Sequence, residues 1–563
     1  MGKKILLLAL ENAIKYDGKA SQGSVIGRLI SDDPGLAKNK DHMKTLSQEI
    51  RETVKKVNEM KLEDQQKEFE KLGGKISKEK KEKNSSLPKL EKTKNVIMRF
   101  EPSPSGPLHI GHAYVLGLNH YYAKKYNGKL ILRIGDTNAS NIYEPSYDLI
   151  PKDADWLTSS SVSELMIQSD RLDIYYEYAL KFIEAGHCYV CTCPAEEFRE
   201  TSKKKEECLC RGLTPEQNIK RWHDMFGKTE EGGAVLRFKT DMKHKNPAMR
   251  DFPLFRINDD AHPRTEKKYR VWPLMNFSVL IDDHESEMTH IVRAKDHADN
   301  AKRQEMMYKA MDWLVPQTLF VGRINFEDLE VSCSKTREKI DEGEFTGWDD
   351  IKLPFIGALK RRGYQPETFI KYAVDVGISL SDKTVSKKDF FKTLNHFNKE
   401  ILEEKSNRFF FIADPVEVSV KDAPSLEIEL DLHPDHRKGG RDLHCDENFY
   451  LAKEDVDNFK TKEIIRLIDC LNFTVENKKD NEFNYHSTDF GQVKGNAKLI
   501  HWLPQHDTTN VEVVMEDGSV VKGKGERLLD DLKEGDIVQF VRFGFCRLDS
   551  IEEDKLVFWF GHH

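Results

Sequence analysis

The sequence predicts a multidomain protein with a helical N-terminal domain, an interrupted α/β core, a helical connector and a C-terminal all-β region. Its 563 residues are too many for one ordinary hydrophobic core and suffice for roughly three to five domains. Helical periodicity with few prolines fills residues 1–72, and a strand–helix–strand pattern begins at Asn95. After about Arg408, short apolar runs alternate with turn residues, which is typical of β structure.

Composition and charge narrow the class of protein. No run of about 18 apolar residues is present, so no membrane span is expected. The apolar stretch Ile5–Leu10 is followed at once by Glu11 without a cleavage site, which favours a helix over a signal peptide. Because the net charge is −8, a nucleic-acid ligand would need local basic patches. The nine cysteines, four of them close together, favour a reducing compartment, and we expect a cytoplasmic protein.

The N-terminal region is predicted to be helical, since Thr45–Leu72 has almost no helix breakers. The lysine-rich segment Gly73–Lys94 has no apolar period and is predicted to be a solvated linker. Contact of its lysines with a phosphate backbone is a second interpretation. Docking of a partner protein by the N-terminal helices is left open.

Alternating elements predict the α/β core. Val96–Phe100 is a candidate strand, a helix is expected from about Gly111 to Tyr126, and Lys129–Ile134 is a second strand. This order begins a parallel nucleotide-binding sheet. Val279–Ile281 and Thr289–Val292 are expected to be strands that return to it, and residues 350–405 to be helical. Five apolar runs predict an all-β domain or a pair of barrels: Val416–Val420, Leu426–Leu430, Val511–Met515, Ile537–Phe543 and Leu556–Phe560.

The strongest functional signal is the segment Pro104-Ser105-Gly106-Pro107-Leu108-His109-Ile110-Gly111-His112. A strand delivers the chain to a tight turn, after which His109 and His112, at i and i+3, share one face of the first helical turn. The helix N-terminus offers free N–H groups to phosphate, and Gly111 leaves space for an adenine or ribose. The pattern predicts a site that stabilises charge on an α-phosphoryl group during displacement.

A second basic segment, Ser332-Cys333-Ser334-Lys335, lies more than 200 residues later. Lys335 beside two hydroxyls is suited to neutralise departing pyrophosphate. The two segments resemble the HIGH and KMSKS signatures of class I aminoacyl-tRNA synthetases, the second in a divergent S-x-S-K form. The resemblance is to the archaeal and eukaryotic type of glutamyl-tRNA synthetase. It extends along the chain through Arg99-Phe100, Gln168–Leu172, Ala234–Asp241, Asn246–Ala248, Arg250-Asp251, Lys268–Leu274, Ile281–His284, Gly347–Asp350, Ile500–Trp502 and Val538–Phe540.

This resemblance implies a Rossmann-type catalytic core, an insertion that binds the tRNA acceptor stem, and C-terminal β-barrels that bind the anticodon. The implied domains are a helical N-terminal domain (1–72), a basic linker (73–94), two halves of the core (95–167 and 271–325) around the acceptor-stem insertion (168–270), a KMSKS-type loop with a helical connector (326–405), and the anticodon-binding barrels (406–563).

The resemblance further implies ATP-dependent ligation of glutamate to tRNA through a glutamyl-adenylate, with Mg²⁺ bound to the phosphates. His109, His112 and Lys335 are expected to stabilise transition-state and pyrophosphate charge, with Ser332 and Ser334 as loop donors. The expected ATP-binding residues are Pro104, Gly106, His109, Gly111, His112 and Lys335. The expected amino-acid-binding residues are Arg99, Ser103, Asp136, Met275 and Arg293, among which the two arginines offer a fork to a carboxylate. For either arginine alone, a structural salt bridge is the alternative.

Two departures from the family pattern concern the amino-acid pocket. Gly135 stands where the family has an acid that holds the substrate ammonium group, and Met275-Asn276 stands where tyrosine and aspartate are usual. Asp136 is the first candidate to replace the missing acid. The departures leave open a related enzyme that acts on another acyl substrate. A tRNA-binding protein without catalysis is a further alternative.

Four cysteines predict a metal site. Cys191-x-Cys193 and Cys208-x-Cys210 form two pairs separated by fourteen residues. Four thiolates can close a tetrahedral structural Zn²⁺ site. Cys188 is close enough in sequence to compete as a ligand, and buried thiols without a metal are the alternative.

Overall fold

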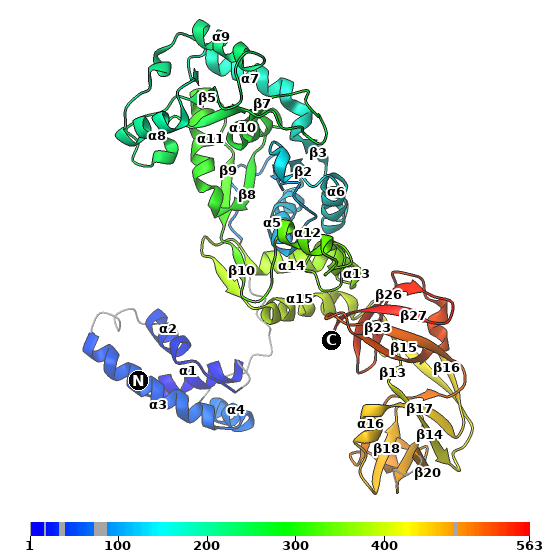
Figure 1. The fold of residues 1–563 in the computed structure, drawn as a ribbon. Helices are drawn as coiled ribbons and strands as arrows, with labels where there is room; N and C mark the ends of the chain where they lie inside the picture. Colours follow the sequence, from blue (N-terminus) through cyan, green and yellow to red (C-terminus); the bar gives the residue numbers. More distant parts are fainter. Residues whose placement is uncertain (1, 16–17, 33–39, 73–86, 477–480) are drawn as a thin grey trace. The chain divides into compact units, whose positions relative to one another are not determined.

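The computed structural model describes residues 2–15, 18–32, 40–72, 87–476 and 481–563, and the chain divides into two compact units, residues 1–84 and 85–563 (Figure 1). In its described part, the first unit has four helices with a core of its own. Ile5, Ala9 and Ala13 recur at a spacing of four, so that one face of the first helix is buried. The predicted helical character is confirmed for α1 Gly2–Lys15, α2 Gln22–Asp32, α3 Lys40–Glu59 and α4 Leu62–Lys71.

The lysine-rich segment expected to be a solvated linker is a linker only in part. Residues 73–86 lie outside the described residues, but residues 87–94 pack on the core of the second unit. Leu87 and Leu90 are buried in that core, and the Tyr122 hydroxyl donates to the Pro88 carbonyl at 2.8 Å. Two buried leucines among exposed neighbours suffice to hold the segment against the second unit, and we call residues 87–94 the strap.

A five-stranded parallel sheet in the order β3–β2–β1–β8–β9 forms the core of the second unit. The strands predicted near Val96–Phe100, Lys129–Ile134 and Thr289–Val292 are confirmed as β1, β2 and β8. Parallel strands end at the same edge of a sheet, so the chain segments that follow these three strands meet there. The bounds are β1 Ile97–Phe100, α5 Ile110–Lys125, β2 Lys129–Ile134, α6 Ser146–Leu157, β3 Glu164–Ile167, β8 His290–Ala294, α11 Ala298–Ala310 and β9 Gln317–Val321.

The strand predicted at Val279–Ile281 is wrong. These residues lie inside helix α10, Met275–Glu285, whose residues from Asn276 to Asp283 are all buried. A short apolar run buried on every side has the same sequence pattern in a helix and in a central strand, so periodicity could not separate them.

Between β3 and α10, an insertion forms a four-stranded antiparallel sheet, β4–β5–β6–β7, that ends at Pro273. Aromatic side chains such as Phe182, Trp222 and Phe255 fill the core between this sheet and its helices. The bounds are α7 Leu172–Glu184, β4 Cys188–Cys191, α8 Ala195–Lys204, α9 Pro215–Met225, β5 Val235–Phe238, β6 Pro253–Ile257 and β7 Val271–Pro273.

A helical connector follows the parallel sheet, as predicted, and it is anchored to the C-terminal region. Arg361 donates two hydrogen bonds of 2.7 Å to Asp549, and buried Arg362 donates to the carbonyl oxygens of Phe560 and Gly561. The bounds are β10 Ile324–Phe326, α12 Cys333–Asp341, α13 Ile356–Arg361, α14 Pro366–Val376, β11 Lys383–Val385 and α15 Lys387–Leu402.

Two seven-stranded sheets and a hairpin make up the described part of the C-terminal region, which confirms the predicted pair of barrels. The first sheet has the order β12–β25–β26–β27–β23–β24–β13, and the second β21–β18–β19–β20–β14–β17–β22. The edge strands β12 and β13 are separated only by Phe410, and β21 and β22 only by His501 and Trp502. Because consecutive residues lie about 3.8 Å apart, the two edges of each sheet must be close together, so each sheet curls round on itself.

The strands of this region are β12 Asn407–Phe409, β13 Phe411–Ala413, β14 Pro415–Lys421, β15 Leu426–His433, β16 Arg437–Cys445, β17 Asn448–Ala452, β18 Glu463–Leu467, β19 Asn472–Val475, β20 Glu482–Ser487, β21 Ala497–Ile500, β22 Leu503–Pro504, β23 Thr508–Val514, β24 Val520–Glu526, β25 Ile537–Phe540, β26 Gly544–Ile551 and β27 Leu556–His562, with the short helix α16 Lys453–Asp457. Searched over its described residues, the chain contains no helix that is both long and apolar enough for a membrane span.

Candidate active site

A cleft of about 750 Å³ opens beside the ends of β1, β2 and β8. Its volume lies in the range of small-molecule and cofactor pockets. Seven of the residues expected to bind ATP or the amino acid line it, together with Gly135: Arg99, Ser103, His109, Gly111, His112, Met275 and Arg293. The others, Pro104, Gly106, Asp136, Ser332, Ser334 and Lys335, are not among the residues that line it.

The two histidines form the N-terminal cap of helix α5. The Nδ1 atom of His109 accepts the backbone N–H of Gly111 at 3.1 Å and that of His112 at 3.4 Å. In return, the Nδ1 atom of His112 accepts the backbone N–H of His109 at 3.4 Å. The rings stack with their centroids 3.7 Å apart. Because each Nδ1 is an acceptor, the proton of each neutral ring lies on Nε2, and each ring keeps one N–H donor for a ligand.

Both imidazoles are neutral at pH 7. Burial lowers the pKa of His112 to about 4. Burial, and then the neighbouring His112, lower the pKa of His109 well below its usual range. The pair therefore offers fixed hydrogen-bond donors instead of cations, which suits the stabilisation of a charge that develops only during reaction.

Gly111 is required by the ring of His109. A Cβ atom at this position would lie 3.0 Å from Cε1 and 3.1 Å from Nδ1 of His109. A nucleotide was expected beside this glycine, and its nearest observed neighbour is the imidazole that caps the helix.

Gly106 brings the second motif against the first. A Cβ atom at Gly106 would lie 2.8 Å from the Cβ and 2.9 Å from the Sγ of Cys333, the first residue of α12. The Cys333 thiol also lies 3.8 Å from the carbonyl oxygen of Pro107. The two segments that resemble the HIGH and KMSKS signatures are thus in direct contact, although more than 200 residues separate them.

Lys335 itself is on the surface. Its Nζ atom pairs with Glu330 at 2.6 Å, and this hydrogen bond raises the pKa of the ammonium group. The hydroxyls of Ser332 and Ser334 are exposed and lie 3.4 Å apart. To bind a phosphate, the lysine has to leave Glu330, and breaking such a solvent-exposed ion pair costs little free energy.

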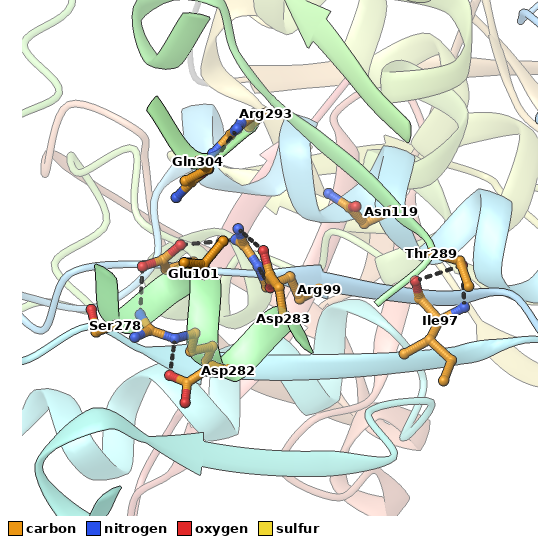
Figure 2. Close-up of polar contacts among 12 residues, drawn as sticks. Ile97, Arg99, Glu101, Asn119, Ser278, Asp282, Asp283, Thr289, Arg293 and Gln304 are labelled. Atoms are coloured by element: carbon orange, nitrogen blue, oxygen red, sulfur yellow. Dashed lines mark hydrogen bonds and ion pairs between the residues drawn. The ribbon is translucent and has the colours of Figure 1, made fainter. Parts of the chain in front are cut away.

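Figure 2 shows a buried network of arginines and carboxylates, of which Arg99 and Glu101 line the cleft. Arg99 donates to Asp283 and, at 2.8 Å, to Glu101. Arg133 donates to Asp282 at 2.7 Å and to Glu101 at 2.5 Å. Burial acts to lower the pKa of Arg99, but Asp283 and Glu101 outweigh it and raise that pKa. Arg99, which was expected to bind a substrate carboxylate, is therefore already paired with two acids of the protein. This is the structural salt bridge that was given as the alternative.

Arg293 differs from the other arginines of the cleft. Its Nη2 atom donates to Gln304 at 3.0 Å, its Nε atom is buried without a partner, and among the described residues it forms no ion pair with a carboxylate. Burial, followed by the nearby Arg99, lowers its pKa to about 10. A buried cation that lacks a counterion is costly unless a ligand supplies one. In Figure 2, Arg293 and Gln304 lie together, apart from the Arg99–Asp283 pair.

Asp136, the first candidate to replace the acid that the family has at position 135, has protein partners in this structure. Its carboxylate accepts the Tyr147 hydroxyl at 2.7 Å and the backbone N–H of Ser169 at 2.9 Å, and it is fully buried. Successive residues of an extended chain point to opposite sides, so Gly135 lines the cleft and Asp136 turns away from it. In this structure Asp136 anchors the chain after β2, and its expected contact with a substrate ammonium group stays a prediction.

The four predicted cysteines converge. The sulfur atoms of Cys191, Cys193, Cys208 and Cys210 all lie within 4.8 Å of one another. The Cys191–Cys208 distance is 3.9 Å and the Cys193–Cys210 distance is 3.8 Å. Arg221 donates to the Cys210 sulfur at 3.2 Å. The sulfur of Cys188 is not part of the cluster.

Sequence reasoning missed several residues of the cleft. Glu101 and Gln304 had no assigned role, and Asp282 and Asp283 stood only inside a family-like segment. A signal for Glu101 was available, since a charged residue directly after a buried strand, at the end where ligands bind, is unusual. Gln304 lies within helix α11 and gives no comparable signal.

Three family profiles match the chain. One described as "tRNA synthetases class I (E and Q), catalytic domain" matches residues 95–404. Two described as the anticodon-binding domain of the same synthetases match residues 406–491 and 499–549.

Curated relatives named glutamate–tRNA ligase are similar over almost the entire chain. The relative from Methanobrevibacter smithii is 42% identical over 559 residues, which cover 98% of both chains. The relative from Methanocaldococcus jannaschii is 42% identical over 566 residues, which cover 100% of both. Among solved structures, a glutamate tRNA ligase from Elizabethkingia meningosepticum in complex with its amino acid is 19% identical. This match covers 56% of this chain and 70% of that chain, with a TM-score of 0.40.

Proposed function

The chain belongs to the class I tRNA synthetases of the glutamate and glutamine group, and on this premise we propose that it ligates glutamate to tRNA with ATP, through a glutamyl-adenylate. The family accounts for ATP, an amino acid and tRNA as substrates. The archaeal relatives named glutamate–tRNA ligase favour glutamate as the amino acid.

The observation that carries the choice of glutamate is the unpaired guanidinium of Arg293. The side-chain carboxylate of glutamate would give this cation the counterion that it lacks among the described residues, in the forked geometry that arginine favours. Glutamine would offer a neutral amide and leave the buried charge uncompensated. The pocket therefore favours a dicarboxylic amino acid.

In the first step, an α-carboxylate oxygen of glutamate attacks the α-phosphorus of ATP, and pyrophosphate leaves. The Nε2–H groups of His109 and His112 donate to the phosphoryl oxygens as their charge increases. Lys335, once released from Glu330, neutralises the pyrophosphate, and Ser332 and Ser334 donate to it. Mg²⁺ that enters with ATP would supply further charge neutralisation. No side chain has to act as a nucleophile, because positioning and electrostatics can supply most of the rate.

In the second step, a terminal ribose hydroxyl of tRNA attacks the activated carbonyl, and AMP leaves. The two barrels, which match the anticodon-binding profiles, would hold the far end of the tRNA. The nine free cysteines support a reducing, cytoplasmic setting for this activity.

Zn²⁺ is the metal that the cysteine cluster fits best. With Zn–S bonds of about 2.3 Å, the sulfurs of a tetrahedral site lie about 3.8 Å apart, close to the measured 3.8 and 3.9 Å. The metal would hold the loop between Cys193 and Cys208 to strand β4, and Arg221 would support the thiolate of Cys210.

Elemental analysis of the purified chain tests this site. We expect one zinc ion per chain, lost in Cys208→Ser and retained in Cys188→Ala, whose residue stands in the same strand outside the cluster. A full zinc content in Cys208→Ser would remove the assignment.

Charging of a tRNA pool with labelled glutamate or glutamine tests the function. We expect glutamate to be charged, and His109→Ala and Lys335→Ala each to lower the rate by about 10²–10³, the usual effect of removing one charge-stabilising donor. Arg293→Gln should lower the charging rate with glutamate by a similar factor and leave ATP binding unchanged. A folded Arg293→Gln variant that charges glutamate normally would contradict the proposed role of the arginine.

A further inference from the structure

We propose that Glu101, at the end of strand β1, binds the α-ammonium group of the amino-acid substrate. This inference rests on the function proposed above, and it identifies the group that the neighbouring Gly135 cannot supply. Glu101 therefore helps to determine which molecules the cleft accepts.

The first support is position. A Cβ atom at Gly135 would lie 3.4 Å from the Oε1 atom of Glu101, so the carboxylate of Glu101 occupies the space above the glycine. Both residues line the cleft, as do His109 and Arg293. The carboxylate thus reaches, from β1, the place that a side chain at position 135 would fill from β2.

The second support is the hydrogen-bonding capacity of this carboxylate. Its two oxygens accept one N–H each, from Arg133 at 2.5 Å and from Arg99 at 2.8 Å. A carboxylate has about four lone-pair sites, so acceptor capacity remains for an ammonium group. The side chain is 17% exposed, and that exposure is toward the cleft that it lines.

The third support is the distribution of charge. Arg99 already has Asp283 as a partner, and Arg133 has Asp282, which also binds Arg171. Of the three carboxylates Glu101, Asp282 and Asp283, only that of Glu101 lines the cleft. Asp296 also lines it, but Asp296 is paired with Arg323 at a more exposed position. An ammonium group in the inner cleft therefore has Glu101 as its anionic partner.

The net charge of the network is opposite to that of glutamate. Four guanidinium groups, those of Arg99, Arg133, Arg171 and Arg293, face three carboxylates, those of Glu101, Asp282 and Asp283. One positive charge remains. An amino acid with two carboxylates and one ammonium group has a net charge of −1 and neutralises it. With the ammonium group at Glu101 and the side-chain carboxylate at Arg293, each end of the substrate lies beside a protein group of opposite charge.

The test compares glutamate with glutarate, the same dicarboxylate without the ammonium group. ATP–pyrophosphate exchange in the presence of tRNA gives the KM for glutamate and the inhibition constant for glutarate in the full-length wild type, Glu101→Gln and Glu101→Ala/Gly135→Glu. Glu101→Gln keeps the shape of the side chain and removes its charge. The double variant restores a carboxylate from the other strand, where the backbone leaves room for a Cβ atom.

We expect Glu101→Gln to raise the KM for glutamate by roughly 30- to 100-fold, the usual effect of losing a charged partner, and to change the glutarate constant less than about threefold. The double variant should recover most of the affinity for glutamate. Equal loss of glutamate and glutarate binding, or an unchanged KM for glutamate, would overturn the role of Glu101 and leave the proposed function intact. A wild type without glutamate-dependent exchange would instead overturn the proposed function.

Discussion

The two ring nitrogens of each active-site histidine have different tasks. Nδ1 accepts backbone N–H groups and fixes the first turn of α5, which leaves Nε2–H as the donor that a ligand could use. The sequence predicted the pair and its shared face because the spacing of three residues settles it. The tautomers depend on the reciprocal cap, which exists only once the turn has folded.

Substitution of His109 by two amides separates these tasks. His109→Asn places an amide near Nδ1, so it keeps the cap and loses the outer donor. We expect its exchange rate to fall by about 10²–10³ with little change in melting temperature. His109→Gln reaches the Nε2 position and should lose less activity, but it gives up about 1 kcal/mol of cap stability. If Asn is the more active of the two in exchange assays, the assigned tautomer is wrong.

The pH dependence follows from the lowered pKa values of the same residues. The folded-state pKa of His112 is about 4, below its ordinary value of 6.5, so the folded protein takes up that proton only in strong acid. The unfolded chain binds the proton as the pH falls through 6.5, and stability is therefore lost between about pH 6.5 and 4. We expect kcat for exchange to show no histidine limb near pH 6.5. If the pH profile of kcat shows a limb near pH 6.5 and His112→Asn abolishes it, the claim that both imidazoles are neutral at pH 7 is contradicted.

At the scale of elements, the contact between the turn before α5 and the start of α12 joins the two segments that resemble the HIGH and KMSKS signatures. The sequence indicated both motifs but not their contact, because nothing in Ser-Cys-Ser-Lys shows that Cys333 packs on Gly106. Periodicity also failed at Val279–Ile281, where a helix buried on all sides has the pattern of a strand. Elements with one solvent face, such as α1 and α3, were predictable.

Gly106→Ala tests the coupling of these elements. Its Cβ atom would lie 2.8 Å from the Cβ of Cys333 and must displace the start of α12. Because a misplacement of order 1 Å can cost about 10²-fold in rate, we expect a fall in kcat of at least about tenfold with ATP binding largely retained. Adding Cys333→Gly removes the clashing atom and should restore part of the rate. An active Gly106→Ala variant would show that the contact is not needed.

At the scale of the whole molecule, the chain consists of a helical unit with its own core and a catalytic unit that begins with the strap of residues 87–94. Composition revealed the order of the domains. The expected start of the catalytic core at residue 95 agrees with the matched profile. Composition did not reveal that Leu87 and Leu90, among the lysines of Gly73–Lys94, pack on that core. The place of Glu101 in the site was not predicted either, because only the folded sheet brings its carboxylate next to Gly135.

Two truncations test where the catalytic unit begins. A chain that starts at residue 87 keeps the strap, and we expect exchange within a few-fold of the full-length value. A chain that starts at residue 95 loses two buried leucines and the Tyr122–Pro88 hydrogen bond, or about 3–5 kcal/mol. It should melt several degrees lower in a thermal scan. Equal melting temperatures for the two truncations would show that the strap contributes nothing.

The most direct test of the whole account is ATP–pyrophosphate exchange on the full-length protein with each of the twenty amino acids, with and without tRNA. A cleft with one uncompensated cation at Arg293 and one available carboxylate at Glu101 predicts exchange that depends on glutamate and is far weaker with glutamine. Exchange supported by another amino acid but not by glutamate, or none from folded protein that binds ATP and tRNA, would contradict it.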